Sequence, residues 1–441
     1  MTDNSTNKVV FTIPEIQSLA IKLHQAGELD VAEAFYRKIL DTAPDTLDAL
    51  HFLGLLCHQQ KRYDEAAELI GTIIQLAPDI ADAHNNLGNV MEGLNKRDEA
   101  EACYRRAIAI NPSHASAHNN LGVLLFWSRR CDESLIEHRK AVELAPGSAD
   151  FHYNLGNALR KLDRHDEAVT IYREAIAVDP QHNGSWQGLA RCYLLADRRD
   201  LAATVYEEWL HLFPGDQSII YMLNACKGDN TPARAPESYI QLVFDNMADR
   251  FDSHLEGLGY HAPQLLCDAL AAHLPPAAAS LEILDAGCGT GLCGPYLKPY
   301  AANLTGVDLS TGMLEKAAFR KVYDSLVMAE LESFMIRNQT RFDAIASADT
   351  LCYFGELGAA FKSACGALRP DGLFAFTLED CKDGAAGMVL NTHGRYSHAK
   401  GYVESCLDAA GLRVELFSSV ILRNEAGEPV VGHLVVARKP A

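Results

Sequence analysis

The segment Leu281-Glu282-Ile283-Leu284-Asp285-Ala286-Gly287-Cys288-Gly289-Thr290-Gly291 decides the fold of the C-terminal half of the chain. Its first part is mostly apolar and predicts a buried strand that runs into an acid. Glycines at alternate positions follow, and they permit a tight turn and a close approach of the backbone to a ligand. A helix is expected from about Leu292, so the order is strand, glycine loop and helix.

The spacing of these glycines separates the loop from the dinucleotide-binding type. The order here is Asp-x-Gly-x-Gly-x-Gly, from Asp285 to Gly291. A loop that seats a pyrophosphate on a helix N-terminus has the order Gly-x-Gly-x-x-Gly. An acid at the end of the strand suits a ligand that carries positive charge and no phosphate. The loop therefore makes a dehydrogenase the weakest of the alternative functions.

A second acid follows 23 residues after the first. The stretch Asn303-Leu304-Thr305-Gly306-Val307-Asp308-Leu309-Ser310 predicts a strand, an acid at its end and a helix that starts at Ser310, a favourable N-cap residue. A carboxylate at the tip of the second strand can accept hydrogen bonds from both hydroxyls of a ribose. We therefore expect Asp308 to bind the sugar of a nucleoside ligand.

Strands and helices alternate through the rest of this half. We expect further strands near residues 326–329, 342–348, 373–378, 413–419 and 433–438. A turn over residues 424–429 joins the last two, which predicts a hairpin and an antiparallel strand at the edge of the sheet. The predicted domain is α/β and Rossmann-like, with a mixed seven-stranded sheet.

The first half of the chain is an internal repeat of 34 residues. Prolines mark the end of each unit, and small residues lie 12 and 24 places before each proline. The prolines are Pro44, Pro78, Pro112, Pro146, Pro180 and Pro214, and the small residues are Ala32, Ala66, Ala100, Ser134, Ala168 and Ala202, then Ala20, Gly54, Gly88, Gly122, Gly156 and Ala190. Small residues let two antiparallel helices approach closely, and proline ends the second helix. An aromatic residue often lies eight places before the proline and is expected to fill the gap to the next repeat.

This pattern resembles the tetratricopeptide repeat, whose period and Gly, Tyr, Ala and Pro positions it shares. The resemblance implies an all-α solenoid of six stacked repeats, with a capping helix near residues 218–227. We expect repeats and cap to span residues 13–227. Residues 228–238 are rich in turn-forming residues and predict a linker, so the second domain is expected to span 239–441.

Asparagines recur on the first helix of three repeats. Asn86, Asn120 and Asn154 are one repeat apart, so stacking should align them as a ladder on the concave face. An amide offers both a donor and an acceptor, and a row of amides can hold the backbone of an extended peptide. The stretch resembles the repeats of O-GlcNAc transferase, which implies a protein or peptide partner. The alternative is that these amides cap local backbone or face water.

Residues 240–440 resemble class I S-adenosylmethionine-dependent methyltransferases. Within that class they are most similar to bacterial proteins that couple tetratricopeptide repeats to this domain. The closer likeness lies in Phe244-Asp245, Arg250-Phe251-Asp252, Leu258-Gly259-Tyr260 with Pro263, and Asp349 with Tyr353-Phe354-Gly355. The resemblance implies S-adenosylmethionine as the cofactor and methyl transfer as the reaction.

The resemblance also implies which residues hold the cofactor. The first motif would hold its methionine part through Asp285, Gly287, Gly289 and Gly291, with the Asp285 carboxylate near the ammonium group. Asp308 matches the acid that binds the ribose. We therefore expect the loop and the end of the second strand to form one site.

Two further segments are implied to complete the cofactor site. Glu330-Leu331 follows the third strand, where the family usually has aspartate, and would contact the adenine amino group. An amphipathic helix from Tyr239 to Leu258 precedes the first strand and would cover the ligand cleft. Within this helix, Met247 or Tyr239 is expected to lie over the cofactor.

Two residues are candidates for acid–base roles. Asp349 ends the fourth strand, and His398 follows Arg395-Tyr396-Ser397 before a helix, where these residues could line the acceptor pocket. Methyl transfer needs a general base only when the acceptor is protonated. The alternatives are a helix cap for Asp349 and a helix-terminal residue without chemistry for His398. The fourth-strand motif is not Asn/Asp-Pro-Pro-Tyr, which argues against N-methylation of bases or glutamine amides.

Composition excludes other classes of protein. The formal net charge of −19, without a Lys/Arg-rich run, argues against nucleic acid as a partner. The N-terminal residues 1–11 are polar, and no segment predicts a signal peptide or membrane span. The 12 cysteines are scattered without a CxxC pair, which predicts a cytoplasmic protein without a metal site or disulfides.

Three functions remain open at the level of sequence. The leading expectation is a methyltransferase whose repeats recruit a protein substrate or partner. The second is a methyltransferase that acts on a small molecule or glycan and uses its repeats for assembly. The third is a repeat scaffold with an inactive methyltransferase domain, which the intact Asp285–Gly291 loop and Asp308 argue against.

Overall fold

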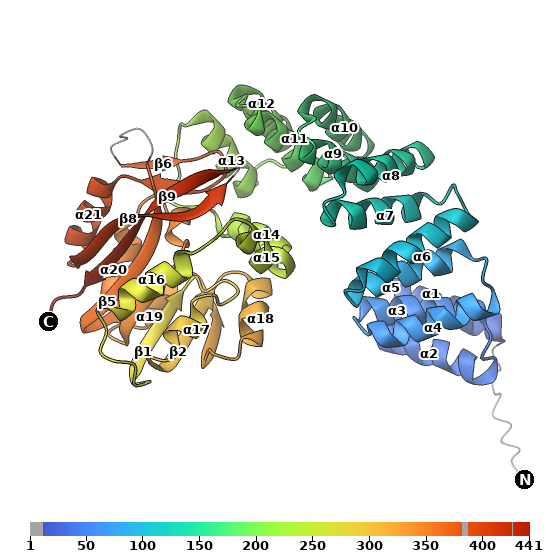
Figure 1. Ribbon diagram of the computed structural model, residues 1–441, viewed down its shortest axis with the longest axis horizontal. Coiled ribbons are helices and arrows are strands. Elements are labelled where there is room, and N and C mark those ends of the chain that lie inside the picture. The colour runs from blue at the N-terminus through green and yellow to red at the C-terminus, as the bar shows by residue number, and fades with distance from the viewer. Residues whose placement is uncertain (1–11, 382–386, 426) are drawn as a thin grey trace, which may run out of the picture. The chain divides into compact units, whose positions relative to one another are not determined.

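The computed structural model describes residues 12–381, 387–425 and 427–441 of the chain. The chain forms two compact units, Met1–Asp197 and Arg198–Ala441, both drawn in Figure 1. The polar N-terminal segment and residue 426 of the predicted final turn lie outside the described residues. Within the described ranges, every helix is too short or too polar to cross a bilayer.

The first unit is helical and consists of paired helices joined by short turns (Figure 1). Its helices are α1 (Ile13–Gln25), α2 (Leu29–Thr42), α3 (Leu47–Gln59), α4 (Tyr63–Leu76), α5 (Ala81–Gly93), α6 (Arg97–Ile110), α7 (Ala115–Trp127), α8 (Cys131–Leu144), α9 (Ala149–Lys161), α10 (His165–Val178) and α11 (Asn183–Leu195). This is the arrangement that the period of 34 residues predicts.

The glycines of the repeat allow close packing of aromatic side chains between helices. A Cβ atom added at Gly156 would lie 2.6 Å from the ring of Tyr172 in the same repeat. A Cβ added at Gly188, in the next repeat, would lie 2.5 Å from the same ring. Tyr172 therefore fills the space between two repeats, as expected, and it is completely buried.

The second unit begins within the sixth repeat rather than at the predicted linker. Its first helices are α12 (Arg199–Leu212) and α13 (Gln217–Lys227), and α13 is the predicted capping helix. Asp216 caps α13 by accepting hydrogen bonds from the backbone N–H groups of Ser218 and Ile219. The Tyr221 hydroxyl on α13 donates to the carbonyl of Gly394 at 3.0 Å. The cap helix thus packs against the α/β domain.

The α/β domain contains one mixed sheet of nine strands in the described residues, two more than expected. The strands are β1 (Leu281–Ala286), β2 (Ala301–Asp308), β3 (Ser325–Met328), β4 (Phe342–Ser347), β5 (Leu368–Asp380), β6 (Met388–Leu390), β7 (Tyr396–His398), β8 (Arg413–Glu425) and β9 (Glu428–Arg438). The extra pair, β6 and β7, are three residues each and form an antiparallel pair beside the end of β5. Such short strands carry no periodic signal in the sequence.

The other strands form the expected seven-stranded mixed core of the sheet. Its order is β3-β2-β1-β4-β5-β9-β8. The pairs from β3 to β5 are parallel, whereas β9 is antiparallel to both β5 and β8. The final hairpin therefore supplies the predicted antiparallel strand, but β9 lies between β5 and β8 while β8 forms the edge, and both strands are longer than expected.

Helices cover both faces of the sheet (Figure 1). One buried layer includes side chains of α19 (Leu331–Arg337), α20 (Gly358–Ala367) and α21 (Lys400–Ala409). The opposite layer includes α16 (Ala262–Ala271) and α17 (Gly294–Leu297). The remaining elements are α14 (Glu237–Met247), α15 (Phe251–Gly257) and α18 (Thr311–Phe319), with short 3-10 turns η1 (Ala248–Arg250) and η2 (Leu351–Tyr353). This sandwich leaves the carboxyl ends of β1 to β4 open for a ligand.

Candidate cofactor and active site

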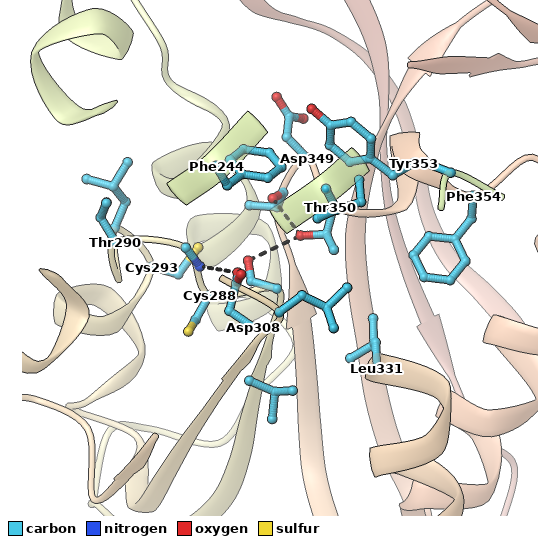
Figure 2. A pocket seen from close by; sticks show the side chains of 18 of the residues that line it. Phe244, Cys288, Thr290, Cys293, Asp308, Leu331, Asp349, Thr350, Tyr353 and Phe354 are labelled. Carbon is cyan, nitrogen blue, oxygen red and sulfur yellow. Dashed lines mark hydrogen bonds between the residues drawn. The ribbon is translucent and has the colours of Figure 1, made fainter. Parts of the chain in front are cut away.

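A cavity opens at the carboxyl ends of the parallel strands and contains about 1010 Å³ of empty space, part of it open to solvent. The loop after β1, the ends of β2, β3 and β4, and helix α14 contribute to its lining. Figure 2 shows Asp308, Leu331, Asp349 and Thr350 around this space. Ligands of open α/β sheets bind at this edge, where neighbouring loops diverge.

The glycine loop has a backbone that a side chain would disturb. Gly287, Gly289 and Gly291 all have positive φ angles, of 75°, 53° and 84°. A Cβ at Gly287 would lie 2.1 Å from the Thr350 hydroxyl oxygen, so β4 and the loop meet at that point. By contrast, a Cβ at Gly289 would have no heavy atom within 4 Å. A side chain at position 287 would therefore clash with Thr350, whereas Gly289 borders open space.

The loop amides donate their hydrogens within the protein. The N–H groups of Gly287 and Cys288 both donate to the Val307 carbonyl, at 2.8 and 3.0 Å. The Gly291 N–H donates to the Cys288 carbonyl at 2.8 Å. The Gly289 N–H donates to Oδ2 of Asp308 at 2.9 Å. These four amides are therefore not available as the donors that a phosphate group requires.

Asp308 connects the glycine loop to the helix that follows β2. Its Oδ1 accepts from the Ser310 N–H at 2.9 Å, while its Oδ2 accepts from Gly289. Burial raises the pKa of Asp308 above its ordinary value, although these backbone hydrogen bonds oppose the increase. The carboxylate lines the cavity and is fixed in place, so it is suited to accept hydrogen bonds from a ligand.

Asp285 lies beneath the loop rather than on the cavity wall. It is 1% exposed, and its Oδ2 accepts from the Tyr323 hydroxyl at 2.6 Å. Burial raises its pKa to about 7, against the opposing effect of the Tyr323 hydrogen bond. Asp285 is not among the residues that line the cavity, and its position near a ligand ammonium stays a prediction.

Glu330 and Leu331 both line the cavity at the end of β3. Glu330 caps α19 by accepting from the N–H groups of Glu332 and Ser333, and its Oε1 also accepts from Arg234 Nη1 at 2.7 Å. Burial opposes ionisation, yet the backbone hydrogen bonds and the Arg234 charge hold the pKa of Glu330 below its ordinary value. The carboxylate that the sequence assigns to adenine is thus already ion-paired.

Asp349 lies at the cavity wall and belongs to a buried ionic network. Its φ angle of 49° is in the left-handed region, which is uncommon for a residue other than glycine and is found at functional sites. Its Oδ2 accepts from Arg423 Nη1 at 2.8 Å, and its Oδ1 accepts from the Thr377 hydroxyl at 2.8 Å. Burial raises its pKa, while the Arg423 charge and the Thr377 hydrogen bond lower it.

The ionic network that includes Asp349 contains more acids than bases. Arg423 is 4% exposed and also pairs with Glu379 and Glu425. Arg395 pairs with the same two glutamates, each at 2.6 Å. Three carboxylates therefore surround two guanidinium groups, and this excess of negative charge lies next to the cavity. No local pattern in the sequence marked Arg423 as part of this site, because its partners Asp349 and Glu379 are 74 and 44 residues away along the chain.

His398 lies outside the cavity. It is completely buried, and its Nε2–H donates to the Phe354 carbonyl at 2.8 Å. Burial lowers its pKa to about 4 and keeps the imidazole neutral. The structure therefore does not bring His398 together with Asp349 in one cavity, because the strand β7 turns the imidazole into the protein interior.

The helices before β1 cover the cavity, but with different residues from those expected. Neither Met247 nor Tyr239 is a lining residue, whereas Phe244 of α14 is. Figure 2 shows Phe244 beside Asp349 and Tyr353. The rings of Phe244 and Tyr353 pack edge to face, with their centroids 5.5 Å apart. Helical periodicity placed Phe244 on the same apolar face as Met247, but it could not show which of them reached the cavity.

Two acids anchor these covering helices to the domain. Asp252 Oδ1 accepts from the Thr290 hydroxyl at 2.5 Å, and its Oδ2 pairs with Arg320 at 2.5 Å. Asp245 Oδ1 accepts from the Ser310 hydroxyl at 2.5 Å. The covering helices are thus attached to the glycine loop and to the N-terminus of α18. Both acids occur in the segments that carry the closer family resemblance.

In the first unit, two of the three asparagines of the predicted ladder donate hydrogen bonds to asparagines of the preceding repeat. Asn120 Nδ2 donates to the side-chain oxygens of Asn85 and Asn89, at 3.1 and 3.0 Å. Asn154 Nδ2 donates to Asn119 Oδ1 at 3.0 Å. The ladder amides are half-buried, and the acceptors of their hydrogen bonds are other asparagines of the preceding repeat. Part of their hydrogen-bonding capacity is therefore used in joining the repeats.

Comparison with known families agrees with both halves of this description. Residues 284–376 match the family described as a methyltransferase domain. Residues 45–113, 113–181 and 153–217 match families described as tetratricopeptide repeats. The methyltransferase match starts in β1 and ends in β5, so it contains the glycine loop, Asp308, Glu330 and Asp349.

Individual relatives match over part of their length. A malonyl–acyl-carrier-protein O-methyltransferase of Pseudescherichia vulneris is 32% identical over 138 residues, which is 31% of this chain and 52% of that protein. Methyltransferase-like protein 27 of Homo sapiens is 40% identical over 89 residues, or 20% of this chain and 36% of that protein. The solved structure of a tetratricopeptide-repeat protein of Thermus thermophilus is 18% identical, covers 42% of this chain and 100% of that one, and has a TM-score of 0.37.

The chain spans about half the length of the malonyl–acyl-carrier-protein methyltransferases that it matches, 52% of one and 55% of another. The strand order of the sheet and the period of the repeat agree with these family matches. This chain is a tetratricopeptide-repeat protein with a class I methyltransferase domain in its C-terminal half.

Proposed function

We propose that the chain is an S-adenosylmethionine-dependent methyltransferase whose tetratricopeptide repeats recruit a protein substrate or partner. The observation that carries this proposal is the chemistry of the glycine loop. The amides of Gly287, Cys288 and Gly289 donate within the protein, and the Asp308 carboxylate lies beside them. A pyrophosphate would meet negative charge there in place of free N–H groups. A cofactor that has ribose hydroxyls and a net positive charge would instead meet hydrogen-bond acceptors there.

The residues of the cavity fit this cofactor part by part. Asp308 is held so that its carboxylate can accept from ribose hydroxyls, and the space beside Gly289 is open for the methionine part. The carboxylates of Glu330 and Asp349 also line the cavity. The net negative charge of the network that contains Asp349 favours the sulfonium cofactor over its uncharged-sulfur product, which assists release of the product.

S-adenosylmethionine supplies a methyl group that is already activated on a sulfonium, so the protein supplies mainly orientation. Asp308 and the glycine loop orient the cofactor. Phe244, Tyr260 and Tyr353 form an aromatic wall of the cavity, which excludes water from the path of the methyl group. This arrangement suits in-line transfer to an acceptor held at the same wall.

Asp349 is the candidate proton acceptor for a protonated acceptor group. Each of its oxygens makes one hydrogen bond in the protein, and a carboxylate oxygen can accept two. Burial raises its pKa, which makes it a stronger base than an exposed aspartate. The buried position of His398 leaves it without contact to the cavity, so this proposal gives it no part in proton transfer.

The relatives suggest an alternative acceptor. Several are named as methylating oxygen on a malonyl group carried by acyl-carrier protein. In this chain, Arg395 and Arg423 already share the carboxylates of Glu379 and Glu425, and Arg423 also binds Asp349. An additional carboxylate would meet net negative charge there. We therefore favour a neutral or protonated acceptor over a carboxylate.

The repeats support recruitment of a protein through their asparagines. Asn120 donates both hydrogens of its amide to the preceding repeat, whereas Asn154 uses one. An amide oxygen has two lone pairs. The oxygens of Asn86 and Asn120 each accept one long hydrogen bond, of 3.4 Å, from the neighbouring asparagine. The ladder would thus accept mainly from the backbone N–H groups of an extended peptide.

The test is calorimetric titration of the full chain with S-adenosylmethionine and, separately, with S-adenosylhomocysteine. We expect both to bind. Proteins captured by the chain should then receive labelled methyl groups from S-adenosylmethionine. A folded protein that binds neither ligand would refute the methyltransferase proposal and favour a repeat scaffold with an inactive domain.

A further inference from the structure

The segment between the cap helix and the covering helices is part of the cofactor cavity. Residues 231–237, here called the strap, were expected to be a linker. Arg234 forms an antiparallel bridge with Phe354. The Ala235 N–H donates to the Tyr353 carbonyl at 2.8 Å, and the Ala233 carbonyl accepts from the N–H groups of Gly355 and Glu356, both at 2.8 Å. The strap therefore lies along the turn that follows β4.

Both ends of the strap are attached to the same domain. The Tyr396 hydroxyl on β7 donates to the Pro232 carbonyl at 2.7 Å. Ala235 packs in a buried cluster with Tyr221 of α13 and Tyr396. The strap then runs directly into α14, the first covering helix. Its position is thus fixed by the backbone and by buried side chains.

Arg234 directs its side chain to the end of β3. Its Nη1 lies 2.7 Å from Glu330 Oε1, and its Nη2 lies 3.5 Å from Glu237 Oε1. Arg234 and both acids line the cavity. The guanidinium side chain is 39% exposed, so these ion pairs contribute little to stability. They fix its orientation, because two carboxylates hold two different nitrogen atoms.

The end of the cavity that Arg234 covers is the place for the nucleobase. The Ala329 N–H donates to the backbone carbonyl of Asp308 at 3.2 Å, so Glu330 lies next to the residue proposed to bind ribose. Ala329 and Leu331 provide apolar surface there. A ring attached to a ribose on Asp308 would lie between that surface and the strap. The planar guanidinium group stacks on aromatic faces, which a lysine ammonium does not do in the same way.

We propose that Arg234 is a cofactor-positioning residue that contacts the adenine ring of S-adenosylmethionine and forms the outer wall of its subsite. This inference rests on the proposed function. The residue belongs to the strap, outside the glycine loop and outside the ends of the parallel strands. The segment that joins the repeats to the catalytic domain is therefore also part of the cofactor site.

The test uses the full chain and two ligands, S-adenosylhomocysteine and methylthioadenosine, which share only the thioadenosine part. Arg234→Ala should weaken binding of both ligands by the same factor, about 3- to 30-fold for a lost contact between a cation and an aromatic ring. Arg234→Lys should restore less than half of the loss, since it keeps charge but not the planar group. The matched control is Arg369→Ala, which removes an arginine of similar exposure (43%) that pairs with Asp343 away from the cavity.

The possible outcomes separate the two proposals. Equal weakening for both ligands, with melting temperatures of the Arg234→Ala and Arg369→Ala variants shifted alike, supports the inference. Unchanged affinity of Arg234→Ala, loss for S-adenosylhomocysteine alone, or full affinity in Arg234→Lys would overturn it, while the proposed function would stand. Failure of the unaltered chain to bind either ligand would refute the proposed function itself.

Discussion

The carboxylate of Asp308 lies 2.9 Å from the backbone nitrogen of Gly289, and this contact joins the end of β2 to the loop that follows β1. The two residues are nineteen positions apart in the chain but meet at the floor of one cavity. The contact orients the carboxylate and occupies a loop amide at the same time. Both effects favour a ligand that offers hydroxyl groups over one that offers phosphate.

Removal of the Asp308 carboxylate should weaken cofactor binding while the fold remains. A hydrogen bond to a charged group contributes about 1.5–3 kcal/mol, so Asp308→Ala should lower the affinity for S-adenosylhomocysteine by at least about tenfold. Calorimetric titration measures this loss, and circular dichroism checks the fold. The exposed residue Asp408, on α21, provides the control variant Asp408→Ala. Equal affinity in Asp308→Ala and the unaltered chain would contradict the ribose assignment.

Binding of the cofactor should depend on the ionisation of Asp308. Burial raises the pKa of this carboxyl, and protonation converts one of its two acceptor oxygens into a hydroxyl donor. Affinity for S-adenosylhomocysteine should therefore be constant above the raised pKa and decrease as the pH falls through it. Titrations over a pH series measure this. In Asp308→Asn the same decrease should be absent; a profile identical to that of the unaltered chain would assign the effect to another group.

Substitution of the two loop glycines should have unequal effects. A Cβ at Gly287 would lie 2.1 Å from the Thr350 hydroxyl oxygen, whereas a Cβ at Gly289 would meet nothing within 4 Å. Both residues have positive φ, which costs about 1 kcal/mol for alanine in either position. Gly287→Ala should therefore lower the melting temperature more than Gly289→Ala. Differential scanning calorimetry in the absence of ligand measures the difference, and equal shifts would show that the contact with Thr350 relaxes without cost.

Replacement of the asparagine ladder should reduce capture of partners without affecting the cofactor site. The change is the triple substitution of Asn86, Asn120 and Asn154 by alanine. We expect fewer captured proteins that accept labelled methyl groups, and unchanged affinity for S-adenosylhomocysteine. Asn120 and Asn154 also join neighbouring repeats, so a loss of about 1 kcal/mol per removed hydrogen bond is expected in the stability of the repeats.

The control for the ladder keeps this loss of stability separate from loss of binding. Tyr172 donates to Asn157 at 2.8 Å within one repeat, and Tyr172→Phe removes this hydrogen bond without changing a partner of the ladder amides. This variant should be destabilised while still capturing partners. Equal capture by the ladder variant and the unaltered chain would refute peptide binding by these asparagines.

Acid should destabilise the fourth repeat through His138. This residue occupies the place of the tyrosines of other repeats, is 1% exposed, and has a buried Nδ1 without a partner. Burial lowers its pKa from 6.5 to about 4. The unfolded chain therefore binds a proton between these values while the folded chain does not, and stability falls as the pH decreases through that window, by up to about 3 kcal/mol.

Substitution of His138 by phenylalanine should remove this dependence. Phenylalanine is preferable to tyrosine, because Val123 stands where Asn89 accepts the tyrosine hydroxyl of the third repeat. The measurement is urea unfolding of the His138→Phe variant and the unaltered chain at neutral and mildly acidic pH. Parallel loss of stability in both proteins would show that other groups cause the acid sensitivity.

The sequence alone determined the repeat and the parallel part of the α/β sheet. The helices of the repeats follow from a period of 34 residues, and the α/β core follows from strands that end in Asp285 and Asp308. These features are local, since helix ends, glycine turns and strand alternation depend on neighbouring residues. For the same reason, the tight glycine loop after the first strand could be located without a structure.

Tertiary structure alone decided which candidate side chains share a cavity. His398 ends β7 and Asp349 follows β4, but His398 turns into the interior, while Asp349 meets Arg423 from a strand 74 residues later. The sequence of the strap predicts a linker because it is rich in turn-forming residues. In the structure, its backbone pairs with the turn after β4 and places Arg234 against Glu330. Contacts between segments far apart in the chain depend on how layers pack, and residue spacing carries no record of that packing.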